Sequence, residues 1–191
     1  SDEAPKRELT PAEQQAEEAR MKEEAMKLVE AQRLREEAQL RAFANKVLKK
    51  GQDLAAKGTW VPAVRVFSDF VKSGMHGVPY PPDSDEAYNA NYGIANALAR
   101  AGLLQSAANK LLEVVRAGPE KIWFEKAFNQ LRDLRRRINY RPPELEDLTK
   151  FSVATKSKVF QNSFHYFVGE FLHDFGLSPE AIPYLEKITD T

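Results

Sequence analysis

The stretch "ARAGLLQSAANKLLEVVRAGP", residues 99–119, places small and large apolar residues in two short runs around Gly102. With the residues just before it, it forms a set with steps of 3, 4, 5, 4 and 3: Ala95, Leu98, Gly102, Ala107, Leu111 and Val114. The same steps give Gly51, Leu54, Gly58, Ala63, Phe67 and Phe70, and also Gly169, Leu172, Gly176, Ala181, Leu185 and Ile188. This recurrence predicts three copies of one structural unit.

The residue types at these six positions predict a pair of antiparallel helices. The first small residue lets one helix approach its neighbour, and the large residue three positions later packs on the same face. Glycine then ends the helix, because it adopts a left-handed backbone without a Cβ penalty. Alanine lets the second helix cross closely, and its large residues fill the space between the two. Since no strand-like alternation occurs in the chain, we expect an all-α fold.

This pattern resembles the tetratricopeptide repeat (TPR) family, which has small and large residues on the first helix and alanine and a large residue on the second. Pro119 follows Ala107 at the family's interval. The family's tryptophan is absent, and Val47, Asn91 and His165 stand in its place. The resemblance covers about residues 44–191. It implies an α-solenoid of helical hairpins whose first helices line a concave, peptide-binding groove.

The distances between the three sets predict four units, at about 44–77, 88–121, 122–160 and 162–191. Gly51 and Ala95 are 44 residues apart, which is ten more than the family's period of about 34. The insertion "GMHGVPYPPD", residues 74–83, explains the excess and serves either as a partner-contacting loop or as a spacer. A degenerate third unit has its first helix in "EKIWFEKAFNQLRDLRRRI", with Ile122, Phe128 and Leu131 as its apolar residues. Pro142 and Pro143 disturb its second helix.

The N-terminal part reads as a loose leader, residues 1–10, followed by a long charged helix over residues 11–43. Thr10, Pro11 and Glu13 have the spacing of a capping box with proline at the first helical position. Oppositely charged pairs four residues apart support the helix: Glu18–Lys22, Glu23–Lys27 and Glu37–Arg41. Because the apolar positions hold no steady heptad, we expect a solvated stalk helix rather than a long coiled coil.

Composition excludes several classes of function. Twenty-eight basic residues balance 28 acidic ones, so no general basic surface for nucleic acid is present. No apolar run of about 18 residues could span a membrane. The start at Ser1, the charged leader and the lack of cysteine fit a mature protein of the bacterial periplasm or cell envelope, which we favour over a cytoplasmic domain. The missing capping helix after the last unit suggests a fragment of a longer repeat protein.

No arrangement of residues predicts catalysis, so we expect no enzyme, no cofactor and no metal. Phosphate-binding glycine loops and nucleophile motifs are absent. Glu170 and His173, with Asp174 nearby, have the spacing of metal ligands, but we interpret them, together with His165, as an ordinary polar cluster on a helix. We interpret the basic run "RDLRRRINYR", residues 132–141, as a solvated helix end in preference to a site for an acidic peptide, a lipid headgroup or RNA.

The TPR resemblance places amide and aromatic side chains in the groove, where they suit a bound peptide. The predicted groove residues are Asn45, Leu48, Gln52, Asn89, Tyr92, Asn96, Arg100, Tyr166, Phe167, Glu170 and His173, with Ser163 beside them. The family's carboxylate clamp is not expected, since its places hold Leu48, Gln52, Gly93, Ser163 and Phe167. The predicted function is a non-enzymatic scaffold for a protein or peptide partner. Two alternatives stay open: self-association through the stalk or the exposed last unit, and an accessory repeat domain of a larger enzyme.

Overall fold

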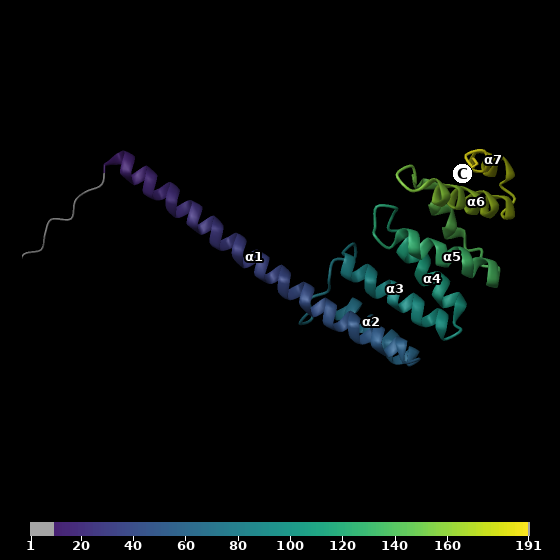
Figure 1. Cartoon of the computed structure of the whole chain (residues 1–191), viewed down its shortest axis with the longest axis horizontal. Coiled ribbons are helices and arrows are strands. Elements are labelled where there is room, and N and C mark those ends of the chain that lie inside the picture. Colours follow the sequence, from purple (N-terminus) through teal and green to yellow (C-terminus); the bar gives the residue numbers. More distant parts are fainter. Residues whose placement is uncertain (1–9, 191) are drawn as a thin grey trace, which may run out of the picture. The chain divides into compact units, whose positions relative to one another are not determined.

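The computed structural model describes residues 10–190, which form seven α-helices and one 3-10 helix (Figure 1). In chain order these are α1 (Pro11–Ala56), α2 (Trp60–Ser73), α3 (Asp85–Arg100), α4 (Leu104–Val115), α5 (Phe124–Ile138), η1 (Pro143–Lys150), α6 (Lys158–Asp174) and α7 (Ser178–Leu185). Residues 10–190 contain no β-strand, only an isolated bridge between Met75 and Val78. The predicted all-α class is therefore confirmed.

The chain divides into two units between Phe43 and Ala44, and helix α1 contributes to both. Residues 11–42 of α1 are exposed along their whole length, and the first buried residue of the helix is Ala44. The second unit, from Ala44 onward, holds the other helices and the hydrophobic core.

The N-terminal unit begins with the predicted capping box. The Thr10 backbone N–H donates to Glu13 Oε2 at 2.8 Å, and the Glu13 N–H donates to Thr10 Oγ1 at 3.3 Å. The bond from the Thr10 N–H, together with one of 2.8 Å from the Thr10 hydroxyl to the same carboxylate oxygen, lowers the pKa of Glu13. The predicted pair Glu23–Lys27 is present at 2.5 Å, whereas Glu37 binds Arg33 at 2.6 Å rather than the predicted Arg41. Exposed pairs of this kind keep the helix solvated and add little stability.

Three turns with the same geometry join helices in the second unit. Their glycines, Gly58, Gly102 and Gly176, have φ values of 77°, 83° and 76°. In each turn the residue after the glycine donates its N–H to the carbonyl five positions earlier, at 2.9–3.0 Å, and the glycine N–H donates to the carbonyl three positions earlier, at 2.9–3.1 Å. This pattern is the Schellman motif, which ends a helix at a residue in the left-handed conformation. The predicted helix bends at these glycines are confirmed.

Small residues in the helices allow the close contacts that the repeated spacing predicts. A Cβ added at Gly51 on α1 would lie 2.6 Å from the Phe67 ring on α2, and one at Gly169 on α6 would lie 2.6 Å from Leu185 on α7. Phe67 also touches α3, where a Cβ at Gly93 would lie 2.7 Å from the same ring. The Phe67 side chain, 1% exposed, therefore fits between two glycines on neighbouring helices.

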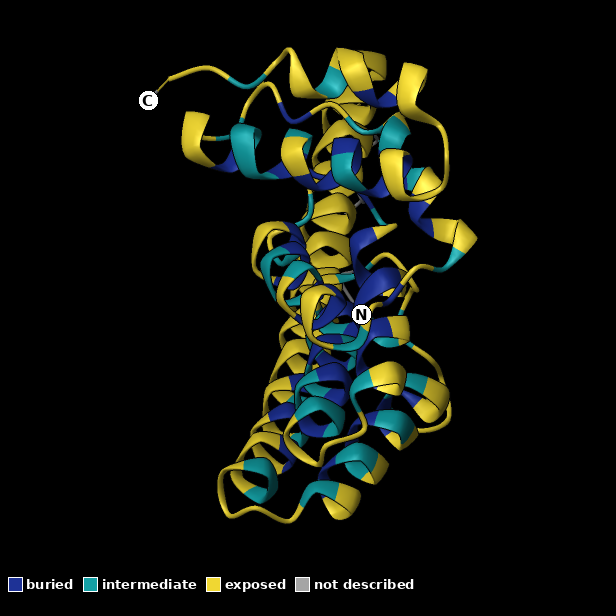
Figure 2. Ribbon diagram, turned by 90° about the vertical axis from the view of Figure 1, so that its right-hand side faces the viewer, coloured by how far each residue is buried: buried dark blue, intermediate teal, exposed yellow. Residues whose placement is uncertain are grey.

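Adjacent helices pack throughout the second unit: α2 on α3, α3 on α4, α4 on α5, and α6 on both η1 and α7. Figure 2 shows the buried residues gathered on the facing sides of these helices. Five phenylalanines connect α5 to α6, with ring centroids 5.1–6.3 Å apart: Phe124, Phe128, Phe160, Phe164 and Phe167. The aromatic cluster explains how α5 and α6 are joined.

The segment predicted as a degenerate unit contains α5 and the 3-10 helix η1. Helix α5 starts at Phe124, so Ile122 lies before it and is 77% exposed, contrary to its predicted apolar role. Asn139 ends α5 in the left-handed region, with φ 51°, and the Tyr140 N–H donates to the Arg135 carbonyl at 3.3 Å. Asn139 thus takes the glycine position of the other turns, and Arg135 takes the position of their leucines.

The insertion at residues 74–83 folds back on α2. The Met75–Val78 bridge closes a tight turn at Gly74, where an added Cβ would lie 1.9 Å from the Val78 carbonyl oxygen. The ring of Tyr80 lies 4.7 Å from that of Phe70, and burial raises the pKa of Tyr80. The Tyr80 ring therefore packs on this unit instead of projecting as a free contact.

Candidate functional site

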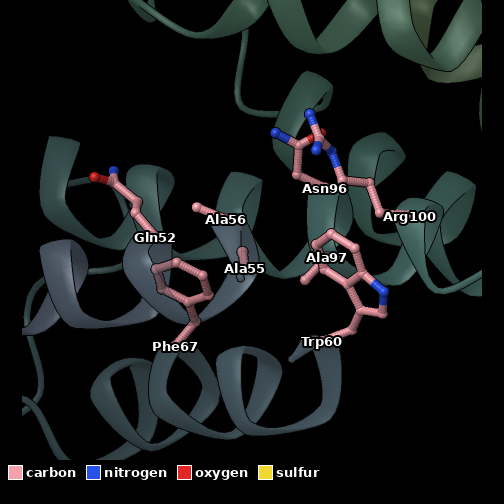
Figure 3. A pocket seen from close by; sticks show the side chains of 9 residues that line it. Gln52, Ala55, Ala56, Trp60, Phe67, Asn96, Ala97 and Arg100 are labelled. Atoms are coloured by element: carbon pink, nitrogen blue, oxygen red, sulfur yellow. The ribbon is translucent and has the colours of Figure 1, made fainter. Parts of the chain in front are cut away.

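A pocket of about 230 Å³ opens between α1, α2 and α3, within the second unit. Three of the predicted groove residues line it: Gln52 from α1, and Asn96 and Arg100 from α3 (Figure 3). Gln52 is 44 or more positions from the other two in the chain, yet all three border one hollow. The rest of its lining is apolar or small: Ala55, Ala56, Trp60, Phe67, Gly93 and Ala97.

The small residues explain why space remains here. Gly93 and the alanines of α1 and α3 have no bulk to fill the region above the Phe67 ring, which is itself held between Gly51 and Gly93. Trp60, the first residue of α2, lies two positions after the turn glycine Gly58 and forms the accessible aromatic wall, because the Phe67 ring is almost fully buried. Figure 3 shows both aromatic side chains below the polar groups of Gln52, Asn96 and Arg100.

The polar rim combines one cation with two amides. The Arg100 guanidinium lies 5.9 Å from the centroid of the Trp60 ring, and no ion pair joins it to a carboxylate among the described residues. Asn96 Oδ1 accepts a hydrogen bond of 3.1 Å from Gln130 Nε2 on α5, which orients the amide and leaves its NH₂ group as the free donor. The pocket can therefore accept an apolar side chain and offer donors to a carboxylate or a peptide carbonyl.

A second polar cluster lies between α5 and α6 and is closed by ion pairs. Arg135, 6% exposed, places Nη2 2.7 Å from Asp174 Oδ2 and Nη1 3.5 Å from Glu170 Oε2. Its guanidinium also lies 5.5 Å from the centroid of the Phe167 ring. Since a buried arginine requires charged partners, these carboxylates serve the fold first. Nearby, Arg132 donates to Ser163 Oγ, so the basic run 132–141 is used partly inside the unit.

The structure buries three predicted groove residues. Leu48, Tyr92 and Phe167 are 5%, 8% and 1% exposed, so they offer almost no surface to a ligand. Tyr92 stacks on Trp123 with ring centroids 5.1 Å apart, and burial raises its pKa. Each of these three side chains lies on a buried face of its helix. Their predicted place in an open groove is therefore corrected to the core.

The remaining predicted groove residues do not line this pocket. Asn45 and Tyr166 are exposed, Asn89 is half-buried, and Glu170 belongs to the Arg135 cluster. His173 lies at the end of α6, where Nδ1 is 3.0 Å from Ser178 Oγ. The structure thus brings together Gln52, Asn96 and Arg100 and leaves the other residues of the prediction dispersed.

Trp60 and Gln130 contribute to the site but were not among the predicted groove residues. The sequence signal for Trp60 was its place just after a turn glycine, where an aromatic residue begins the second helix of a pair. Gln130 belongs to the irregular third hairpin, whose register could not be read from glycine and leucine positions.

The described residues form neither a cluster of metal ligands nor a candidate transmembrane helix. Within residues 10–190 no three His, Cys, Asp or Glu side chains come together as metal ligands. Glu170 and Asp174, considered beside His173 as ligands, instead bind Arg135. No described helix is both long and apolar enough to cross a bilayer.

Comparisons with family models, curated proteins and solved structures find no match for this chain. Its function is therefore inferred from its own residues and geometry.

Proposed function

We propose that this protein is a non-enzymatic scaffold of the tetratricopeptide type that binds a peptide segment of a partner protein. The binding surface is the side formed by the first helices of the hairpins, which are α1 from Ala44, α3, α5 and α6. Three Schellman turns at one repeated position, and the glycines that admit Phe67 and Leu185, support the repeat architecture.

The observation that carries the peptide-binding proposal is the convergence of Gln52, Asn96 and Arg100 on one pocket beside the Trp60 ring. At about 230 Å³ the pocket is smaller than the 300–1,000 Å³ of typical small-molecule sites, so it suits one anchoring side chain of a longer ligand. Tryptophan and arginine, here Trp60 and the exposed Arg100, are typical of residues that dominate binding at protein interfaces.

The charge of the pocket defines the ligand further. Arg100 has no carboxylate partner among the described residues, and Asn96 keeps a free NH₂ group. A peptide with an acidic residue beside an apolar one can pair its carboxylate with Arg100 and Asn96 while its apolar side chain contacts Trp60. A charge-assisted hydrogen bond to arginine contributes about 1.5–3 kcal/mol.

Selection of random 12-residue peptides displayed on phage, with the full chain immobilised, tests this proposal. We expect enriched sequences to pair an acidic residue with an apolar one. The variants Arg100→Ala and Asn96→Ala should weaken the selected peptides about tenfold or more, since each removes a bond of roughly 1.5 kcal/mol.

The matched controls are Arg65→Ala and Gln105→Ala, which change exposed side chains on the second helices α2 and α4. They should leave peptide affinity unchanged. Failure to enrich any peptide, or equal losses in the control variants, would contradict binding at this pocket. Thermal melts of every variant separate a binding defect from unfolding.

One observation favours self-association as a second function. Met26, Val29 and Leu34, close together along the N-terminal unit, are 73%, 68% and 53% exposed. Sedimentation equilibrium on the full chain and on a Met26→Glu, Val29→Glu variant tests this alternative. Only a dimer that the variant abolishes supports it, and a wild-type monomer at all micromolar concentrations rules it out.

A further inference from the structure

A second hollow in the same unit, of about 440 Å³, lies on α6 and α7 and on the segment that joins η1 to α6. Its polar lining comes from separate parts of the chain: Thr149, Lys150, Ser152, Lys158, Gln161, His165, Tyr184 and Lys187. None of these residues lines the pocket of Gln52, Asn96 and Arg100, so this hollow is a separate feature.

The charge of this hollow is one-sided although the chain as a whole is neutral. No Asp or Glu lines it, whereas three lysines and one histidine do. Lys150 is bound by Asp147, with Nζ 2.9 Å from Oδ1. Lys158 and Lys187 have no carboxylate partner among the described residues. Two lysines therefore remain available to an anion.

The histidine in this hollow responds to that charge. Burial first, then Lys187 and Lys158, lower the pKa of His165, and its buried Nδ1 has no hydrogen-bond partner among the described residues. The charged groups that line the hollow with His165 are Lys158 on its own helix, Lys187 after α7 and Lys150 on η1, the last already paired with Asp147. An anion between the two unpaired lysines would offset the part of this lowering that the lysines cause.

The position of Lys158 adds to the preference for an anion. Lys158 is the first residue of α6, a 17-residue helix whose N-terminus carries a partial positive charge. The hollow is also large enough for more than an isolated anion, and its volume falls in the range of small-molecule sites. Phe151 and Tyr184 provide aromatic walls for an apolar body.

We propose that this hollow binds a small phosphate monoester, with Lys158 and Lys187 pairing with the phosphate dianion and Phe151 and Tyr184 contacting its organic part. Two unpaired cations and a helix N-terminus suit a dianion better than a single carboxylate.

NMR titration with phenyl phosphate tests this site, because the chain has only three histidines. The imidazole signals of His165 should shift in a saturable way while those of His76 and His173 stay, and the pKa of His165 should rise in the complex. The double variant Lys158→Gln, Lys187→Gln should weaken binding about fivefold or more. The matched control Lys46→Gln, Lys57→Gln, at exposed sites on α1 and in the turn after it, should bind as the wild type does.

Two further probes test the contributions of the phosphate group and of the aromatic ring separately. Inorganic phosphate should bind more weakly than phenyl phosphate, and benzoate, a monoanion with the same ring, should bind more weakly still. Equal binding of benzoate overturns the preference for phosphate, and equal or tighter binding of inorganic phosphate overturns the monoester. No saturable shift of His165, or unchanged affinity in the lysine double variant, overturns the site itself. Failure here leaves the peptide proposal intact, because the variants lie outside its pocket.

Discussion

The contact between Phe67 and two glycines makes the effect of Gly51→Ala specific enough to test. Alanine at this helical position gains about 1 kcal/mol from its better helix propensity. Its methyl group, however, would lie 2.6 Å from the Phe67 ring, where ordinary van der Waals contact begins at 3.4 Å. The ring must therefore move by most of an ångström.

The ring has no free direction in which to move. Its other side lies against α3, where a Cβ at Gly93 would be 2.7 Å away, and the side chain is 1% exposed. Overpacking of this kind destabilises by about 1–3 kcal/mol. After the propensity gain, we expect Gly51→Ala to lower the free energy of unfolding by up to about 2 kcal/mol, or Tm by at most roughly 8 °C.

Gly169→Ala is the matched control, because its Cβ meets Leu185 at the same distance of 2.6 Å. Leu185 is 39% exposed and is the last residue of α7, so it can turn outward. The propensity gain should then dominate, and this variant should be neutral or more stable by up to about 1 kcal/mol. Urea unfolding followed by circular dichroism measures both variants.

A double-mutant cycle locates the effect in the ring. Leucine at position 67 relieves the contact with the methyl group introduced at position 51, so Gly51→Ala should be tolerated better in a Phe67→Leu background, with a coupling of about 0.5 kcal/mol or more. The reasoning is refuted if Gly51→Ala and Gly169→Ala change stability alike, or if the cycle shows no coupling.

Three other substitutions test the turn, the ion network and the buried tyrosine by urea unfolding. Gly102→Ala should lower stability by about 1–2 kcal/mol through backbone strain alone, since φ is +83° and nothing lies within 4 Å of the added Cβ; an unchanged stability would contradict this account of the turn. Arg135→Ala should lower stability by about 2 kcal/mol, less than for a fully buried pair because its carboxylates are 24–35% exposed, and Arg135→Met should recover part of this by packing. Burial first, then Glu144 and Glu113, raise the pKa of Tyr140 to about 12, above roughly 10 in the unfolded chain. The stability that this raised pKa provides is complete below pH 10 and is lost between about pH 10 and 12, at up to about 1.4 kcal/mol per pH unit. The free energy of unfolding of Tyr140→Phe should therefore depend less on pH in that window.

The helix bends and the helix start were predictable because they depend on local chemistry. Glycine at positions 58, 102 and 176 adopts the left-handed conformation that ends a helix, whatever lies around it. Thr10 and Glu13 cap each other within one turn of the chain.

The third hairpin was harder to read because other residue types replace the repeated ones. Arg132 lies 37 residues after Ala95 and 37 before Gly169, so it occupies the first position of a set between theirs. The steps of 3 and 4 then place Arg135 at the leucine position and Asn139 at the glycine position. Asparagine is the other residue that commonly ends helices in the left-handed region, and this was the available signal. Arg135 is acceptable at a buried leucine position only because Glu170 and Asp174, more than 30 residues later, neutralise it.

The sequence by itself therefore determined the helical class, the helix start at Thr10 and the three glycine bends, since each depends on backbone sterics or hydrogen bonds within a few residues. Only the tertiary structure decided which first-helix side chains are accessible. Gln52, Asn96 and Arg100 border a pocket, while Leu48, Tyr92 and Phe167 are buried. The physical reason is that spacing defines a face of a helix, but the rotation of that face depends on which large side chain, such as Phe67, fits against glycines on its neighbours.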